Sequence, residues 1–199
     1  MRLKALSWMT AAMLAAITVP VSAGMVLKMN LSQLTDRADA IFRGQVLSAE
    51  PGKISIGGGT LPTVTYRVRV DEAFKGEFDA KENAAPEVEL TMLGTVKAIV
   101  RSGSQTRLPS SLPEVPKLRV GEDYVLFTTA PSKSGLRSPV GLGQGSFRIY
   151  LGANKTELAV NELNNLGLFD GGTSAQRAGD RGPVTYTRLA VAIVAELGK

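Results

Sequence analysis

The sequence predicts a mainly β fold, an antiparallel barrel or sandwich with a short N-terminal helix and a C-terminal helix. About six to eight short runs are rich in β-branched residues or alternate apolar with polar residues. Gly-rich turns and loops join these runs, and no helical crossover separates one from the next. The chain has 199 residues, 44% of them hydrophobic, which is enough apolar material for the core of one domain.

The first 23 residues have the three parts of an export signal. Arg2 and Lys4 are positive, residues 5–21 are mostly apolar, and Val21-Ser22-Ala23 supplies the small residues of a cleavage site. Pro20 and polar residues interrupt the apolar run, so we expect cleavage rather than a membrane span. The sequence therefore predicts a signal peptide over residues 1–23, a single domain over residues 24–199, and a periplasmic or secreted protein without a remaining span.

The predicted mature chain is mildly basic. Without Arg2 and Lys4 it keeps 21 of the 23 basic residues against 18 acidic ones, a net charge of +3. Basic residues are spread along the chain, whereas nucleic-acid-binding proteins concentrate them on one face or helix. We therefore expect no nucleic-acid partner. The chain has no Cys, so its core must be stable without disulfides.

The first predicted elements are a short helix and a strand. Apolar residues recur at helical spacing within Asn30–Asp39, and Asn30 or Ser32 can cap the first turn. The strand Ala40–Ala49 follows, and either of its residues 41 and 42 is expected to enter the core. Gly44 is expected to mark a bulge or a close backbone approach. Residues 51–59, with one Pro and four Gly, are expected to form a flexible loop.

Two further strands alternate with a period of two. In Thr63–Val70 the even-numbered positions are apolar and the others polar, which indicates one buried face and one wet face. Phe74 is expected to return to the core before a Lys-Gly turn. Residues 87–92 alternate in the same way, and a hairpin to Val96–Val100 is expected. Residues 102–116, rich in Pro and Ser, are expected to form a surface loop.

The C-terminal third predicts a short strand, a hairpin, a loop and a helix. The strand covers Tyr124–Thr128, and the hairpin joins residues 146–151 to residues 156–160. Residues 161–182 are expected to be loosely packed or disordered. The helix, over about residues 186–197, carries Leu189, Ile193 and Leu197 at spacings of four, so this stripe is expected to pack on the sheet. Thr187 can cap its start and Gly198 its end.

Composition excludes several chemistries. With no His and no Cys, the chain cannot form a Ser-His-Asp triad, a Cys nucleophile, the usual zinc site or a haem-attachment motif. It also has no S-x-x-K or G-x-S-x-G motif. We therefore assign no catalytic residue, no metal ligand and no cofactor, and the residues of any binding site stay undefined.

Weaker candidates for a catalytic, phosphate-binding or calcium-binding site come from acidic, glycine and amide residues. Alternate positions on a strand place Glu87 and Glu89 toward solvent, and Glu72, Glu77 and Glu82 are expected to form a solvated edge. Gly141-Leu142-Gly143-Gln144-Gly145 lacks the Lys and helix start of a phosphate cradle, so a bent strand or close crossing is expected. A set of polar residues near the C-terminus could bind calcium, but its spacing does not match the calcium-loop pattern, so a plain polar loop is expected. The set is Asn161, Glu162, Asn164, Asn165 and Asp170.

Three motifs follow one another along the chain in the order in which they occur in one protein family. They are an Ala-Asp-x-Ile-Phe-x-Gly-x-Val run, a strand ending in Phe-Lys-Gly, and a Gly-Glu-x-Tyr-Val-Leu-Phe run. Their residues are Ala38, Asp39, Ile41, Phe42, Gly44, Val46, Val68, Val70, Phe74, Lys75, Gly76, Gly121, Glu122, Tyr124, Val125, Leu126 and Phe127. The series resembles the netrin-module family, which includes the tissue inhibitors of metalloproteinases. It also resembles secreted bacterial proteins with a Gly-Gln-Gly-x-Phe strand, here residues 143–147.

The resemblance implies an OB-like, five-stranded barrel. It does not carry over the zinc-chelating N-terminal Cys of the inhibitors, because this chain has none. Asp39 and Arg43 could suggest catalysis or a salt bridge, but a helix-to-strand corner explains the pattern better. The sequence therefore predicts an exported, non-enzymatic binding domain whose unidentified ligand is a protein or another extracytoplasmic molecule. Two alternatives remain: a hydrolase using carboxylates or a Ser/Lys pair, and a modulator of a co-exported metalloprotease, which rests on the resemblance alone.

Overall fold

The computed structural model describes residues 27–80, 84–95, 117–171 and 181–199. Its elements are α1 (Leu31–Arg37), β1 (Ala40–Ile56), β2 (Gly59–Lys75), β3 (Glu87–Leu93), β4 (Asp123–Thr128), the 3₁₀ helix η1 (Leu142–Gly145), β5 (Ser146–Leu151), β6 (Glu157–Val160), β7 (Val184–Thr185) and α2 (Tyr186–Leu197). The predictions for the signal peptide, Glu82, the strand at residues 96–100 and the loop at residues 102–116 lie outside the described residues.

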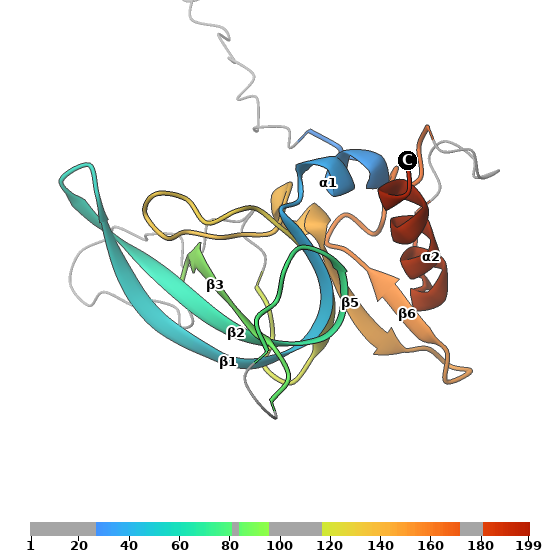
Figure 1. Ribbon diagram of the computed structural model, residues 1–199, viewed down its shortest axis with the longest axis horizontal. Helices are drawn as coiled ribbons and strands as arrows, with labels where there is room; N and C mark the ends of the chain where they lie inside the picture. The colour runs from blue at the N-terminus through green and yellow to red at the C-terminus, as the bar shows by residue number, and fades with distance from the viewer. Residues whose placement is uncertain (1–26, 81–83, 96–116, 172–180) are drawn as a thin grey trace, which may run out of the picture.

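All seven strands form one antiparallel sheet in the order β3-β2-β1-β4-β5-β6-β7 (Figure 1). The predicted class, mainly β with a helix near each end, is confirmed. The sheet is not closed in the described part of the chain, which is compatible with an OB-like barrel. Near its open side, the Arg137 N–H donates to the Thr91 carbonyl of β3 at 2.9 Å, so the loop after β4 reaches the edge of β3.

The β1–β2 ribbon is longer than the sequence predicts. The expected flexible loop at residues 51–59 is wrong, because β1 continues to Ile56 and pairs with β2 up to Gly59. The turn consists of Gly57 and Gly58, with φ of 59° and 79°, the positive values that a tight hairpin turn requires. Beyond the rest of the sheet the ribbon projects as a free two-stranded arm, at the left of Figure 1.

Three register shifts bend this ribbon where it enters the sheet. One lies between Arg43 and Gly44, which confirms the predicted irregularity at Gly44. A Cβ at Gly44 would collide with the Arg69 carbonyl oxygen, so the close backbone approach is also confirmed. Because each inserted residue adds local twist, the shifts curl β1 and β2 around the apolar side chains they enclose.

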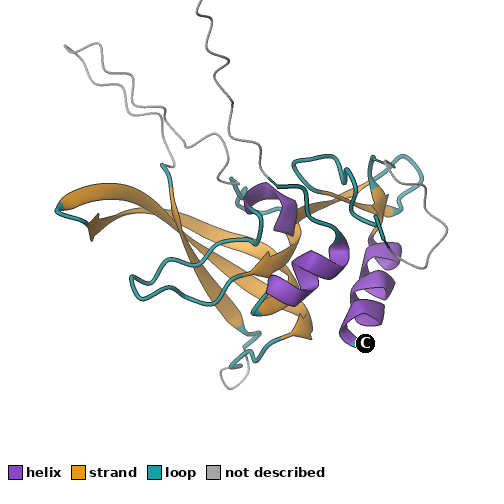
Figure 2. Cartoon of the chain, turned by 90° about the horizontal axis from the view of Figure 1, so that it is seen from above, coloured by secondary structure: helices purple, strands orange, loops and turns teal. Residues whose placement is uncertain are grey.

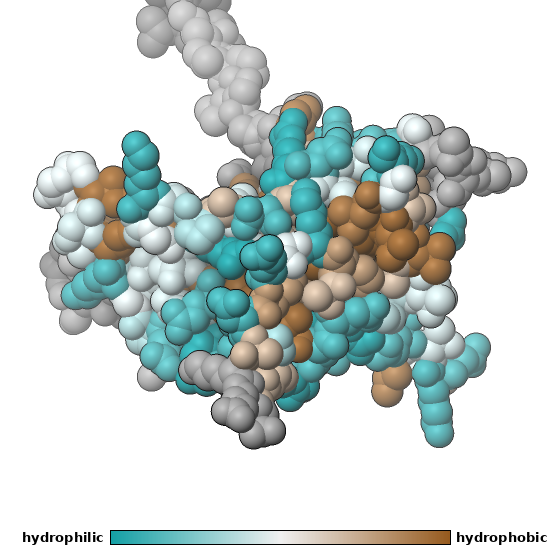
Figure 3. All heavy atoms as spheres, viewed as in Figure 1, coloured by the Kyte–Doolittle hydropathy of each residue, from teal (hydrophilic) through white to brown (hydrophobic). Residues whose placement is uncertain are grey.

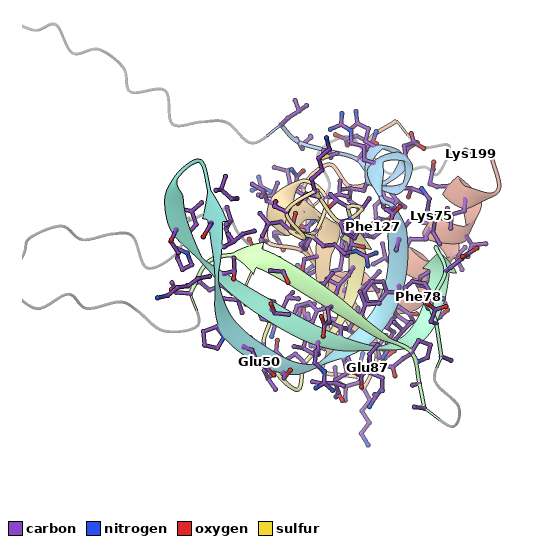
Figure 4. The ribbon with its side chains drawn as sticks, turned by 60° about the vertical axis from the view of Figure 1, so that its left-hand side comes forward. Glu50, Lys75, Phe78, Glu87, Phe127 and Lys199 are labelled. Atoms are coloured by element: carbon purple, nitrogen blue, oxygen red, sulfur yellow. The ribbon has the colours of Figure 1, made fainter. Side chains whose placement is uncertain are left out.

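The sheet separates two hydrophobic cores. Neighbouring residues of β1 point to opposite faces, so Ile41 belongs to one core and Phe42 to the other, both with 0% exposure. The helix-side core lies under α1 and α2, which run side by side in Figure 2. The strand-side core lies inside the curl of β1, β2, β3 and β4. In Figure 4, Phe127 marks the helix-side core and Phe78, stacked edge-on against Phe42, closes the strand-side core.

Most local predictions agree with the structure. The helix-capping box of α1 uses Asn30 and Gln33, whose side chains each accept the other's backbone N–H. Phe74 packs against the helix-side core, as predicted. Residues 146–151 and 157–160 form the predicted hairpin. Thr187 as the cap of α2 is wrong: Thr185 occupies that position and accepts the Arg188 N–H, while Gly198 ends the helix as predicted.

The prediction of loose packing for residues 161–182 is wrong where the structure describes them. Residues 161–171 form successive turns held by two buried amides. The Asn165 amide donates to the carbonyls of Ala159 and Gly182, both at 2.9 Å, and its oxygen accepts the Asn161 N–H. Asn164 and Asn165 have φ of 53° and 56°, a left-handed conformation that Asn tolerates better than most residues. Residues 172–180 lie outside the described part.

Candidate functional site

Arg43 is the centre of a cluster of charged and aromatic side chains. Its guanidinium binds both carboxylate oxygens of Glu157, at 2.6 and 2.8 Å, and lies 3.5 Å from Asp123. It also stacks 4.4 Å from the ring centroid of Tyr186, whose hydroxyl donates to Glu72. We call these five residues the arginine clip. It connects the first residue of α2 to four strands: β1, β2, β4 and β6.

Each pKa shift resolved in the arginine clip favours the protonation state that the group already has at neutral pH. The hydrogen bond from Arg43 lowers the pKa of Glu157, and the same bond, opposed by burial, raises the pKa of Arg43. Burial and the bond to Glu72 raise the pKa of Tyr186. The shifts move the pKa values of Arg43, Glu157 and Tyr186 away from neutral pH, whereas a general acid or base needs a pKa near it. The clip therefore fixes α2 on the sheet, and the sequence-based preference for a helix-to-strand corner over a salt bridge is wrong at Arg43.

The other candidates named from the sequence are structural or exposed. Asp39 lies at the α1–β1 junction and 3.6 Å from Arg137. Glu87 and Glu89 face solvent on β3, as predicted, and Arg67 binds Glu87 at 3.1 Å. Glu77 is exposed as expected. Glu72 is also exposed, but its bond to the Tyr186 hydroxyl makes it part of the arginine clip rather than a purely solvated edge.

The glycine-rich passage forms η1 instead of a bent strand, but its close packing was predicted correctly. A Cβ at Gly143 would collide with the Glu162 carboxylate, and one at Gly145 would collide with the Val140 carbonyl. Between them, the Gln144 amide accepts the Met29 N–H at 2.8 Å and donates to the Leu27 carbonyl at 3.0 Å. This passage therefore ties the N-terminal segment to the helix-side core.

Members of the amide set considered from the sequence as a weak calcium candidate are used in hydrogen bonds and an ion pair. Asn161 donates its side-chain amide to the Gln144 carbonyl, and its oxygen accepts from Leu163 and Asn165. Asp170 instead binds Lys28 at 2.8 Å. In the described residues no group of three or more acidic, His or Cys side chains could hold a metal ion.

Two small hollows flank Phe169 along α2. The helix hollow, of about 130 Å³, lies between α1 and α2 and is lined by Leu31, Leu168, Phe169, Ala192, Ala195 and Glu196, among others. The arginine hollow, of about 160 Å³, lies at the start of α2 and is lined by Asn165, Phe169, Arg181, Pro183, Val184 and Arg188. Both are well below the roughly 300 Å³ at which small-molecule sites begin, so they fit parts of a larger partner better than a free metabolite.

The side of α2 that faces away from the sheet is apolar. Leu189 and Ile193 are fully buried, as predicted, but Val191 and Val194 are 64% and 59% exposed. Leu197, predicted to pack on the sheet, is 36% exposed. We call Val191, Val194 and Leu197 the outer face of α2. In Figure 3 hydrophobic side chains gather on the surface over this helix.

A second exposed apolar group lies far from the first. Ile54 and Leu61 are direct partners across the β1–β2 ribbon, so they share a face with Ile56 near the tip. Ile56 and Leu61 are 43% and 42% exposed. The ribbon tip lies at the opposite end of the molecule from α2 in Figure 1.

Neither the outer face of α2 nor the arginine hollow was predicted from the sequence. A signal for the outer face was present, since α2 has apolar residues around most of its circumference and such a helix is normally covered on more than one side. No comparable signal exists for the hollow, because Phe169, Arg181 and Arg188 are brought together only by the turns before β7.

Comparisons with known proteins supply no family. No protein-family model matches the sequence, and no curated protein matches it. Among the described residues, no helix is both long enough and apolar enough to cross a membrane.

Proposed function

We propose that this chain is an exported, non-enzymatic binding domain that docks another extracytoplasmic protein on the outer face of α2. The export signal over residues 1–23 supports the location, and the exposure of Val191 and Val194 carries the proposal. A partner that covers both valines gains about 1–2 kcal/mol from each, by the usual relation between buried apolar area and free energy.

The arginine clip supports this proposal by making α2 a rigid platform. The clip fixes the first turn of the helix through Tyr186, and Leu189 and Ile193 anchor its inner face. A helix held in this way loses little conformational freedom when a partner binds, so more of the contact energy contributes to affinity. The exposed valines lie three residues apart, on one side of the helix, which is the spacing that helix recognition uses.

The test compares two matched surfaces. Two variants of the mature protein are compared, V191E/V194E on α2 and I56E/L61E on the ribbon tip. Each variant gains two negative charges at exposed apolar positions. Each variant and the unaltered protein is immobilised and exposed to periplasmic extract and culture medium. We expect one protein to be retained by the unaltered chain and by I56E/L61E, and to be lost with V191E/V194E.

Three results would contradict the proposal. The first is a partner lost with I56E/L61E and kept with V191E/V194E, which would move the docking surface to the ribbon. The second is the absence of any retained protein at any salt concentration. The third is hydrolysis of a glycoside, ester or peptide substrate by the purified chain that one Asp or Glu substitution abolishes, because this would make the domain an enzyme.

A further inference from the structure

Two arginines line the arginine hollow without a carboxylate beside them. Of the nine described arginines, six lie within 4.0 Å of an acidic side chain and Arg37 of α1 does not; the six are Arg43, Arg67, Arg69, Arg119, Arg137 and Arg148. Arg181 and Arg188 have no such partner in the part of the chain that the structure describes. The hollow itself is lined by no acidic residue of that part, and the first turn of α2 has none.

The walls of this hollow hold one guanidinium in place and leave its donors available. Arg188 lies 5.2 Å from the ring centroid of Phe169, a distance at which a cation is attracted to the ring face. Stacking uses the flat side of the guanidinium and keeps its N–H groups at the edge free. Pro183 and Val184 form apolar walls beside Arg181, and the Asn165 amide is already bonded to backbone groups.

The chemistry of the hollow fits a carboxylate attached to an apolar group. A guanidinium presents two parallel N–H donors that match the two oxygens of a carboxylate, and this charge-assisted pair is strong and directional. The apolar walls at Phe169, Pro183 and Val184 favour a ligand with carbon atoms next to the anion. A peptide provides both at its C-terminus or at an Asp or Glu side chain. Inorganic phosphate provides the anion alone.

The arginine hollow is also continuous with the outer face of α2. Arg188 and Val191 are three residues apart, so their side chains are neighbours on the helix surface. A single peptide segment can therefore place a carboxylate at Arg188 and an apolar side chain on Val191. Charge complementarity thus selects an acidic segment among the possible partners of the outer face.

We propose that the arginine hollow, formed by Arg181, Arg188 and Phe169, binds a carboxylate of the partner protein, either a chain terminus or an acidic side chain. This inference rests on the proposed function, because it names the chemistry of the protein that docks on α2. Binding at the hollow supplies specificity, and the outer face supplies apolar contact.

The experiment titrates short peptides into ¹⁵N-labelled mature protein and follows backbone amide signals by NMR. The probes are an N-acetylated Gly-Leu-Ala with a free C-terminus, its C-terminal amide, the amide of N-acetylated Gly-Leu-Glu, and inorganic phosphate. We expect the free acid or the Glu peptide to shift the signals of Val184 and Arg188, with an affinity at least about tenfold above that of the neutral amide. The first and third probes distinguish a chain terminus from a side chain.

Variants with matched charge locate the site. R181Q/R188Q should abolish the shifts, whereas K53Q/K133Q removes the same charge from two exposed lysines elsewhere and should preserve them. R181K/R188K keeps the charge but loses the paired donors, so it should bind more weakly than the unaltered chain. The dispersed spectrum of each variant reports whether it is folded, and R181K/R188K keeps the test valid if R181Q/R188Q unfolds.

Several outcomes would overturn the carboxylate site. They are equal affinity for the free acid and the neutral amide, phosphate binding as tight as the best peptide, shifts located away from α2, and full binding by R181Q/R188Q. Failure here is distinguishable from failure of the docking surface. If V191E/V194E loses a captured partner while no peptide carboxylate binds, the outer face stands and the carboxylate assignment falls.

Discussion

The two faces of the sheet are covered in different ways. The strand-side core is built almost entirely from β1, β2, β3 and β4, which curl around it. The helix-side core is assembled from both helices, four strands, the η1 region and the turns before β7. One core is thus made by strands that fold over themselves, and the other needs separate segments to be brought together and fixed.

This difference indicates where polar interactions are needed. The strand-side core is closed by backbone pairing, and its outward side chains form simple pairs such as Arg67 with Glu87. The helix-side core requires the arginine clip and the buried amides of Gln144, Asn161 and Asn165 to hold α2, η1 and the turns. The same segments then present the arginine hollow and the outer face of α2. The proposed binding surface therefore lies on the side assembled from distant parts of the chain.

The largest effect is expected from truncating one large residue in each core. Phe127→Ala should lower the free energy of unfolding by about 3–5 kcal/mol, and Leu90→Ala by about 2–5 kcal/mol, because both side chains have 0% exposure. β1 and β4 contribute to both cores, so each variant should still unfold in a single transition with an unchanged urea dependence. Two separate transitions would show that the cores are independent units.

A single methyl group on the strand shared by both cores should have the next largest effect. At Gly44→Ala the new Cβ meets the Arg69 carbonyl oxygen, which cannot move without disturbing the β1–β2 pairing, so a loss of about 2–3 kcal/mol is expected. Gly59→Ala is the control, since its Cβ would lie 3.7 Å from the nearest atom, an ordinary contact. Urea denaturation measures the free energy of unfolding of both variants, and equal values for Gly44→Ala and Gly59→Ala would contradict the close approach at Gly44.

The strand-side core was largely predictable from the sequence, whereas in the helix-side core only Phe74 and the inner stripe of α2 were. Val64, Tyr66 and Val68 alternate with polar residues, and this period of two is a local signal of a one-sided strand. In the short strand β4 the burial is continuous, because both of its faces meet a core, and alternation disappears. The arginine clip joins residues as far apart as positions 43 and 186, which no local pattern relates.

Errors in the loops have related physical causes. The Gly-rich stretch at residues 51–59 suggested flexibility, but Ile54 and Ile56 are strong β-formers and two of the glycines supply the positive φ of a tight turn. At residues 161–171 the Asn content suggested disorder, whereas buried Asn side chains replace the backbone partners that the turns lack. In both places a residue type common in disordered segments has a defined structural role.

A smaller, pH-dependent effect is expected in the arginine clip. Glu157→Gln should cost about 1 kcal/mol at neutral pH, because it weakens the charged hydrogen bonds to Arg43 but solvent already screens Glu157, whose side chain is 39% exposed. The folded pKa of Glu157 lies below its ordinary value of 4.5, so its charged form stabilises the fold above that pH, and the benefit is lost as pH falls through the lowered pKa. The difference between the two proteins should therefore shrink below pH 4.5.

Urea denaturation at pH 7 and at several values below 4.5 measures this difference. The control is Glu50→Gln, which removes an exposed carboxylate at the edge of the ribbon and should show little effect at any pH. A constant difference between Glu157→Gln and the unaltered protein over the whole range would mean that Glu157 acts through packing rather than through its charge.

The smallest change in stability is expected where the largest change in binding is proposed. V191E/V194E should alter the free energy of unfolding by no more than about 0.5 kcal/mol per substitution, since both side chains face water. Leu189→Ala, on the inner side of the same helix, should cost about 2–4 kcal/mol. Thermal and urea unfolding compare the three proteins. If V191E/V194E destabilised the fold as much as Leu189→Ala, the outer face would be part of the core, and the loss of a partner could no longer be attributed to docking on α2.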